Sequence, residues 1–205
     1  MMPLRPGPHR PTARPSPALI VVGGSWGGLE AASGLLSRLP HPAPVPVLLV
    51  LHRAKRSDRS VVEQMLTKGT GHPVREIEDK EPLCPGTVHL APPDYHVLVE
   101  EGGVSLSVEG HVNHSRPSVD LAFESAATEH GERLVAVLLS GAGRDGAAGI
   151  ATVRRHGGRT FVQDPDDALR PEMPLAALAT GCADESGPVE ALGDALQQLV
   201  AGGVR

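Results

Sequence analysis

Three short apolar runs, each followed by turn residues and a segment with helical spacing, constrain the fold more than any other feature of the chain. The runs are A-L-I-V-V-G at 18–23, V-P-V-L-L-V-L at 45–51 and L-V-A-V-L-L-S-G at 134–141. Strands with continuous apolar character are typical of parallel sheets, because such strands are buried on both faces. The pattern predicts a doubly wound α/β fold, in which helices cover both faces of a mostly parallel sheet.

The rest of the chain is expected to complete a three-layer α/β/α arrangement. The spacing of apolar residues predicts helices at 28–39, at 58–67 with Ser57 as the cap, at 117–129 and at 146–156, with two more at the end of the chain. Short strands are expected at 74–77, 87–91 and 160–163. Segments 96–100 and 104–109 flank E-G-G, which predicts a short antiparallel hairpin.

Composition sets the domain boundaries and excludes several classes of partner. The proline-rich residues 1–16 predict a disordered tail. The length and apolar content of residues 17–202 predict one globular domain. A net charge of −5 argues against nucleic acid, and no apolar run approaches the ~18 residues of a membrane span. With two cysteines and no metal-ligand spacing, we expect no metal, no cofactor and a cytoplasmic location.

The glycine-rich stretch V-V-G-G-S-W-G-G at 21–28 does not fit a nucleotide loop. A dinucleotide fingerprint that starts at Gly23 needs glycine where Ser25 stands, and one that starts at Gly24 needs it at Trp26. The next strand ends in His52 rather than in the acid that would bind a ribose. A phosphate loop is also excluded, because no Gly-Lys-Ser/Thr follows.

The same stretch does match Gly-x-Ser-x-Gly, with Ser25 at its centre. Small residues let a strand turn sharply into a helix, and the backbone N–H groups at the helix start can then bind an oxyanion. A purely structural serine or a phosphate contact stays open on this motif alone. The ordinary α/β-hydrolase order is disfavoured, because there the serine does not follow the first strand.

A serine nucleophile needs a base and a carboxylate that orients the base. His52 ends the second apolar run, and Asp145 follows the third on a glycine-rich turn. Taken singly, His52 fits an ordinary hydrogen-bonded histidine and Asp145 fits a helix cap. Because the carboxyl ends of parallel strands meet at one edge of a sheet, we expect Ser25, His52 and Asp145 to lie close together.

Six segments together resemble the catalytic domain of the CheB-type chemotaxis receptor methylesterases, over roughly residues 18–200. They are V-G-G-S-W-G-G, V-L-H-R, L-C-P-G-T-V-H-L-A-P-P-D-Y-H, S-R-P-S-V-D-L-A-F, L-L-S-G-A-G-R-D-G-A-A-G and V-Q-D-P. The resemblance implies a Ser-His-Asp triad at Ser25, His52 and Asp145. It implies hydrolysis of γ-glutamyl methyl esters on the cytoplasmic helices of methylated chemoreceptors, with deamidation of receptor glutamines as a second activity.

The chain departs from the family pattern next to the nucleophile and in the aspartate loop. Trp26 stands where the family usually has threonine, and Ala142 where it has methionine. The resemblance places Trp26, Gly27 and Ala142 at the oxyanion and substrate site. It also implies a phosphorylated receiver domain before the catalytic domain; here a short tail precedes the first strand, so we expect no phosphorylation control within the chain. A separate receiver protein or a receptor methyltransferase is then a further candidate partner.

Two other functions stay compatible with these residues. The domain could be a catalytically weakened module that binds receptor helices or a methyltransferase, or an esterase for another carboxylic ester. In the S-R-P-S-V-D segment, helix capping and loop structure are the expected roles of Arg116, Ser118 and Asp120.

Overall fold

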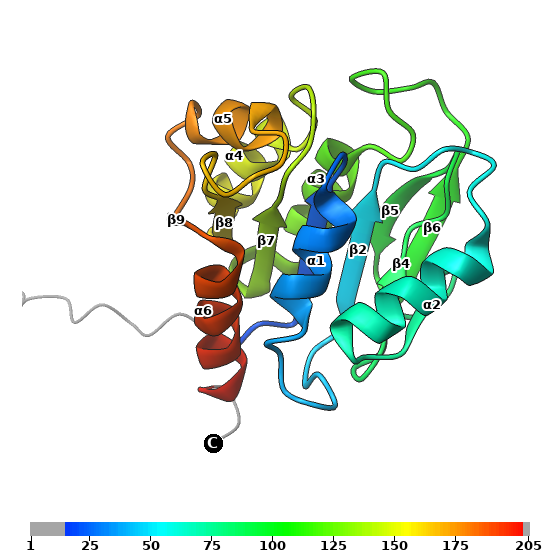
Figure 1. Ribbon diagram of the computed structural model, residues 1–205, viewed down its shortest axis with the longest axis horizontal. Helices are drawn as coiled ribbons and strands as arrows, with labels where there is room; N and C mark the ends of the chain where they lie inside the picture. The colour runs from blue at the N-terminus through cyan, green and yellow to red at the C-terminus, as the bar shows by residue number, and fades with distance from the viewer. Residues whose placement is uncertain (1–14, 203–205) are drawn as a thin grey trace, which may run out of the picture.

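The computed structural model describes residues 15–202, and a seven-stranded parallel sheet forms the centre of that part (Figure 1). The predicted tail at 1–16 lies outside the described residues, except for its last two. The strand order is β3-β4-β2-β1-β7-β8-β9. The strands are β1 (Leu19–Gly24), β2 (Val47–Leu51), β3 (Val74–Glu76), β4 (Val88–Leu90), β7 (Leu134–Leu138), β8 (Arg159–Gln163) and β9 (Glu185–Gly187).

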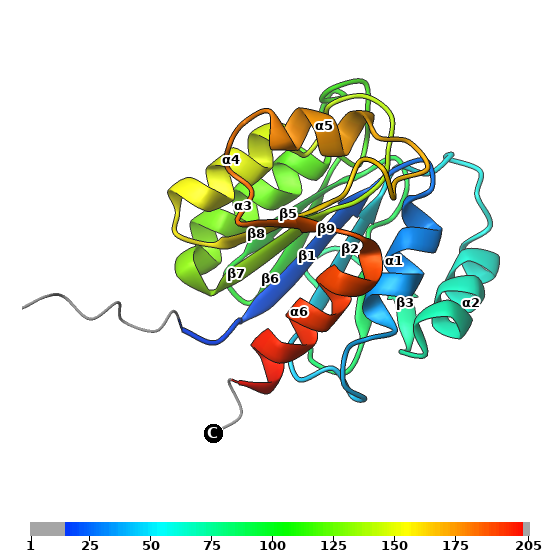
Figure 2. The same ribbon diagram turned by 60° about the vertical axis from the view of Figure 1, so that its left-hand side comes forward.

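Helices cover both faces of the sheet, because successive side chains of a buried strand point to opposite sides (Figure 2). One face packs on α1 (Gly28–Leu36), α2 (Arg59–Thr70) and α6 (Val189–Ala201). The other packs on α3 (Val119–His130), α4 (Ala147–Arg155), α5 (Glu172–Leu178) and the hairpin of β5 (His96–Glu100) and β6 (Gly103–Ser107). A 3-10 turn, η1 (Gly131–Arg133), precedes β7. The predicted three-layer fold with an antiparallel hairpin is confirmed.

Two local predictions were wrong. The cap of α2 is Asp58 rather than Ser57, since the Asp58 carboxylate accepts the N–H groups of Ser60 and Val61 at 2.9 and 3.3 Å. The edge strand β9 was missed, because its sequence E-S-G is polar and half-exposed and carries no apolar signal. By contrast, Ser118 does cap α3, as expected, by accepting the N–H of Leu121.

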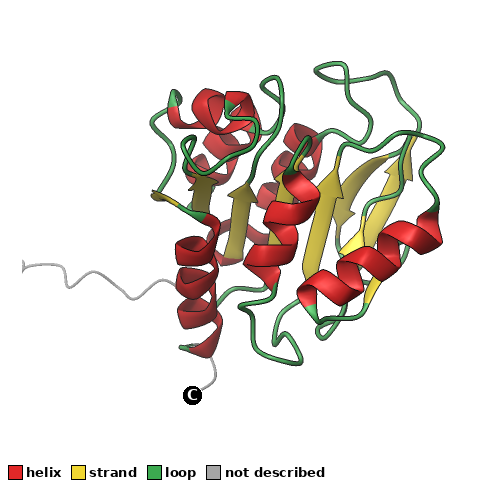
Figure 3. Cartoon of the chain, in the orientation of Figure 1, coloured by secondary structure: helices red, strands yellow, loops and turns green. Residues whose placement is uncertain are grey.

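The chain changes direction of winding between β1 and β7, and this places the crevice of the sheet. From β1 the chain runs through α1 to β2 on one side, and from β7 through α4 to β8 on the other. The loops after these strands gather at one edge (Figure 3), where an open α/β sheet binds its ligands. Within residues 15–202, no helix has the length and apolar character that crossing a membrane requires.

Candidate active site

Asp145 lies in the loop between β7 and α4, but its carboxylate binds the start of another helix. Oδ2 accepts the N–H of Val119 at 2.7 Å, and Oδ1 accepts the N–H of Asp120 at 3.1 Å and the hydroxyl of Ser118 at 2.9 Å. The side chain is 2% exposed. The residue that precedes α4 is Gly146, without a side-chain cap. Asp145 is therefore not the cap of its own helix, and it instead occupies the N-terminus of α3.

These contacts keep the Asp145 carboxyl ionised. Burial by itself raises its pKa, but the hydrogen bonds from His52 and from the Val119 N–H lower it by more, so that the pKa lies below its ordinary value. The positive end of the α3 dipole acts in the same direction. The result is a buried negative charge at the edge of the crevice.

His52 follows β2 and contacts Asp145 through one ring nitrogen and Ser115 through the other. Nε2 lies 2.8 Å from Asp145 Oδ2, and Nδ1 lies 3.2 Å from Ser115 Oγ. Because an ionised carboxylate only accepts hydrogen bonds, Nε2 donates to Asp145. In the neutral ring this leaves the lone pair on Nδ1, where the Ser115 hydroxyl can donate to it.

Ser25 stands on the turn between β1 and α1, and close packing around the turn requires its glycines. A Cβ at Gly23 would collide with the Val119 side chain, and one at Gly27, whose φ is +80°, would lie 2.7 Å from Leu169 Cβ. The backbone of the turn joins the neighbouring strand ends: Ser25 N–H donates to the Ser140 carbonyl at 2.9 Å, and His52 N–H donates to the Gly24 carbonyl at 3.1 Å.

The Ser25 hydroxyl is not held by a hydrogen bond to the described chain. In residues 15–202 the structure therefore pairs His52 with Asp145 and joins the Ser25 turn to His52 through the backbone alone. The backbone N–H of Ser25 is occupied by Ser140, whereas those of Trp26, Gly27 and Ala142 have no acceptor in the described chain. The available donors for an oxyanion are thus the N–H groups after the serine, rather than its own.

Trp26 points outward from the same turn. Its side chain is 66% exposed, and the guanidinium carbon of Arg170 lies 5.6 Å from the ring centroid. Ser140 Oγ joins the two backbones, because it donates to the Trp26 carbonyl at 2.7 Å and accepts the Arg170 N–H at 2.9 Å. Trp26 and Arg170 form a surface platform next to Ser25. Ala142 is also exposed.

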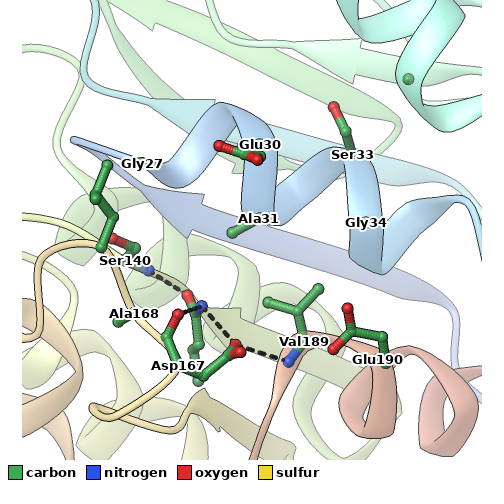
Figure 4. Close-up of a pocket in the computed structure, with 13 residues that line it drawn as sticks. Gly27, Glu30, Ala31, Ser33, Gly34, Ser140, Asp167, Ala168, Val189 and Glu190 are labelled. Atoms are coloured by element: carbon green, nitrogen blue, oxygen red, sulfur yellow. Dashed lines mark hydrogen bonds between the residues drawn. The ribbon is translucent and has the colours of Figure 1, made fainter.

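Two cavities flank these residues. The larger, about 560 Å³, lies between the Gly27 turn, α1 and the start of α6 (Figure 4). Hydrogen bonds run from Ser140 through Gln163 to Asp167 along it, but Ser25, His52 and Asp145 do not line it. The smaller, about 320 Å³, is lined by His52, Ser115 and charged side chains, so it is the cavity that contacts the candidate base. Among the described residues, no group of three His, Cys, Asp or Glu is placed to hold a metal.

Sequence reasoning missed Asn113 and Ser115, which approach from the loop before α3. Asn113 Nδ2 lies 3.3 Å from Asp145 Oδ1, and Ser115 contacts His52. Arg116 has the expected loop role, since it binds Asp94 and the carbonyls of nearby loop residues. The only signal for Asn113 was its type, because asparagine tolerates the left-handed backbone that it adopts at φ +49°.

Comparison with known proteins gives one consistent family. A family model described as CheB methylesterase matches residues 20–196. The protein-glutamate methylesterase/protein-glutamine glutaminase 3 of Burkholderia lata is 41% identical over 83% of this chain and 48% of its own length. The protein of that name from Symbiobacterium thermophilum is 38% identical over 90% of this chain and 51% of its own. The chain therefore spans about half the length of these two relatives.

Two further matches cover nearly all of the other protein. A relative from Leptospira interrogans is 38% identical over 80% of this chain and 86% of its own. The crystal structure of the Thermotoga maritima CheB methylesterase catalytic domain superposes with a TM-score of 0.85 at 30% identity. That match covers 90% of this chain and 100% of the Thermotoga chain.

Proposed function

The chain belongs to the CheB methylesterase family, and on this premise we propose that it hydrolyses γ-glutamyl methyl esters of chemoreceptors to glutamate and methanol. Deamidation of receptor glutamines is the proposed second activity. The supporting observation is the pair of half-buried His52 and buried, ionised Asp145 beside the Ser25 turn. The proposed substrate is the cytoplasmic helices of methylated receptors, and the proposed location is the cytoplasm.

The first step is attack of Ser25 on the ester carbonyl. The substrate brings the Ser25 hydroxyl to His52 Nδ1 in place of Ser115. Nδ1 then takes the proton as Ser25 Oγ bonds to the carbonyl carbon, and the imidazolium that forms faces the Asp145 carboxylate. The unengaged N–H groups of Trp26 and Gly27, with that of Ala142, are the proposed oxyanion donors; one such donor typically contributes about 3 kcal/mol.

The second step releases methanol and regenerates the serine. The carbon–oxygen bond to the methoxy group breaks, and the imidazolium returns its proton to the leaving oxygen. Water then attacks the acyl-enzyme as Nδ1 accepts its proton. The bond between the acyl carbon and Ser25 Oγ breaks, the imidazolium returns the proton to Oγ, and glutamate is released. With a glutamine substrate, ammonia leaves instead of methanol.

The test is methanol release from methylated receptor, measured together with covalent labelling by a fluorophosphonate serine probe. We expect Ser25→Ala to lose both signals, and Ser115→Ala to remain labelled at Ser25. This pair decides which of the two serines near His52 is the nucleophile. Methanol release by Ser25→Ala at the wild-type rate would falsify the mechanism. A panel of small esters beside the receptor separates a receptor methylesterase from a general esterase.

A further inference from the structure

Two buried carboxylates lie side by side where α3 and α4 begin, and the proposed mechanism uses only one of them. Asp120, in the first turn of α3, is 6% exposed and accepts the N–H of Gly149 in α4 at 2.7 Å. Asp145, in the loop before α4, accepts the N–H groups that begin α3. Each carboxylate thus binds the N-terminus of the other's helix, and the two negative charges face each other.

The proximity of the two charges is unfavourable. Burial raises the pKa of Asp120 and the hydrogen bond from Gly149 lowers it, while the charge of Asp145 raises it again, so that the pKa lies above its ordinary value. A donor placed between the two carboxylates offsets this repulsion.

The Asn113 amide is that donor. Nδ2 lies 2.8 Å from Asp120 Oδ2 and 3.3 Å from Asp145 Oδ1. Because both neighbours are carboxylate oxygens, the NH2 end of the amide has to face them, and its two hydrogens match the two acceptors. A neutral amide bridges the pair without adding a charge that could compete with His52 for Asp145.

A tight turn brings the amide to this position. Val112 and Ser115 exchange backbone hydrogen bonds of 3.1 and 2.9 Å, and the two residues between them, Asn113 and His114, have φ of +49° and +64°. Arg116 fixes the base of the turn by donating to the carbonyls of Val108 and Glu109 at 2.7 and 2.9 Å. The amide is therefore preorganised by backbone geometry.

We propose that Asn113 is a positioning residue of the active site, which fixes Asp145 Oδ1 so that Oδ2 stays aligned with His52 Nε2. The inference rests on the proposed function, because it assigns Asn113 a role through the Ser25–His52–Asp145 chemistry. Its effect is on the reactivity of Ser25 rather than on binding of the receptor.

Glycine substitutions at the two left-handed positions of the turn form a matched pair. Asn113→Gly and His114→Gly both relax the backbone at exposed positions, but only Asn113→Gly deletes contacts to the carboxylates, since His114 makes no hydrogen bond within residues 15–202. We expect Asn113→Gly to slow fluorophosphonate labelling of Ser25 about tenfold, the usual effect of losing a hydrogen bond to a charge. His114→Gly should stay within about twofold. In methanol release, Asn113→Gly should lower kcat and leave KM unchanged.

A reciprocal swap separates the contact to Asp145 from the contact to Asp120. Asn113→Asp places a third carboxylate beside the pair and should slow labelling more than Asn113→Gly. Adding Asp120→Asn restores a donor and an acceptor between positions 113 and 120 but leaves a carboxylate facing Asp145 Oδ1, so the labelling rate should recover by less than about twofold.

The outcomes separate this role from the proposed function. Equal labelling rates for Asn113→Gly and His114→Gly, or a swap variant that is labelled as fast as wild type, overturn the positioning role alone. Wild-type protein that is not labelled at Ser25 contradicts the proposed function, and the positioning role with it. Slower labelling of Asn113→Gly without recovery in the swap supports both.

Discussion

The Ser25 turn adjoins the Asp145 pocket, by which we mean the groups that hydrogen-bond the buried Asp145 carboxylate. The structure holds the side chains of Ser25 and Asp145 in opposite ways. The Asp145 carboxylate accepts hydrogen bonds from Val119, Asp120, Ser118, Asn113 and His52. The Ser25 hydroxyl makes no hydrogen bond in the described chain, and it is the backbone around it that is fixed by glycine contacts and by Ser140.

This difference fits the separate demands on the two groups. A nucleophile has to exchange partners during the reaction, so that a rigid backbone with a free hydroxyl serves it. A buried carboxylate has to stay ionised and oriented, and full hydrogen bonding supplies both. Substitutions in the turn should therefore act through sterics, and those in the pocket through unpaired polar groups.

The largest contrast is expected between Asp145→Ala and Ser25→Ala. Both should reduce kcat for methanol release about 10⁴-fold, the scale of losing a triad member. Asp145→Ala also leaves buried donors without an acceptor and should lower the free energy of unfolding by about 3 kcal/mol. Ser25→Ala removes no protein hydrogen bond and should change it by less than about 0.5 kcal/mol. Urea unfolding measures both, and equal losses would break the comparison.

Gly27→Ala tests the steric side of the comparison. The new Cβ would lie 2.7 Å from Leu169 Cβ and 2.8 Å from Ser140 Oγ, at φ +80°. We expect a loss of about 2 kcal/mol of stability from strain and overpacking. Gly143→Ala is the matched control, because its φ is +91° but no heavy atom lies within 4 Å of the added Cβ. A Gly143→Ala loss as large as that of Gly27→Ala would show that backbone strain alone is measured.

Trp26→Ala tests whether the exposed face of the turn contributes to substrate binding. The substitution removes the aromatic ring of the platform that Trp26 forms with Arg170. We therefore expect KM for methylated receptor to rise about threefold, typical of an exposed cation–π contact. Labelling of Ser25 by the small probe should stay within about twofold, since the backbone turn is intact. Trp26→Phe keeps an aromatic face and should restore KM; unchanged KM in both variants excludes the platform from binding.

The smallest effect is expected at Asp94, which binds Arg116 in the lining of the smaller cavity beside His52. Hydrogen bonds from Lys55 and Arg116 lower the pKa of Asp94 to about 2. A lowered folded-state pKa stabilises the protein above the unfolded value, and this stabilisation disappears as the pH falls from about 4 to about 2. Asp94→Asn should therefore lower the urea midpoint at pH 6 and clearly less at pH 2.5. An equal decrease at both pH values contradicts an ionic role.

Residue type and order along the chain were enough to predict the parallel sheet and the strand ends that carry Ser25, His52 and Asp145, because buried strands have a continuous apolar signature. Edge strand β9 had no such signal. Neither did the cap of α2, where Ser57 and Asp58 are both good caps and only the backbone selects between them.

The sequence by itself therefore determined the layers of the fold, the crevice and the chemical types of the residues at its edge. Only the tertiary structure decided how they interact: that Asp145 occupies the N-terminus of α3, that His52 turns Nε2 toward Asp145, and that Asn113 and Ser115 reach the site. The physical reason is range. Strand and helix signals arise between near neighbours, whereas these contacts join segments from different parts of the chain, and only packing brings them together.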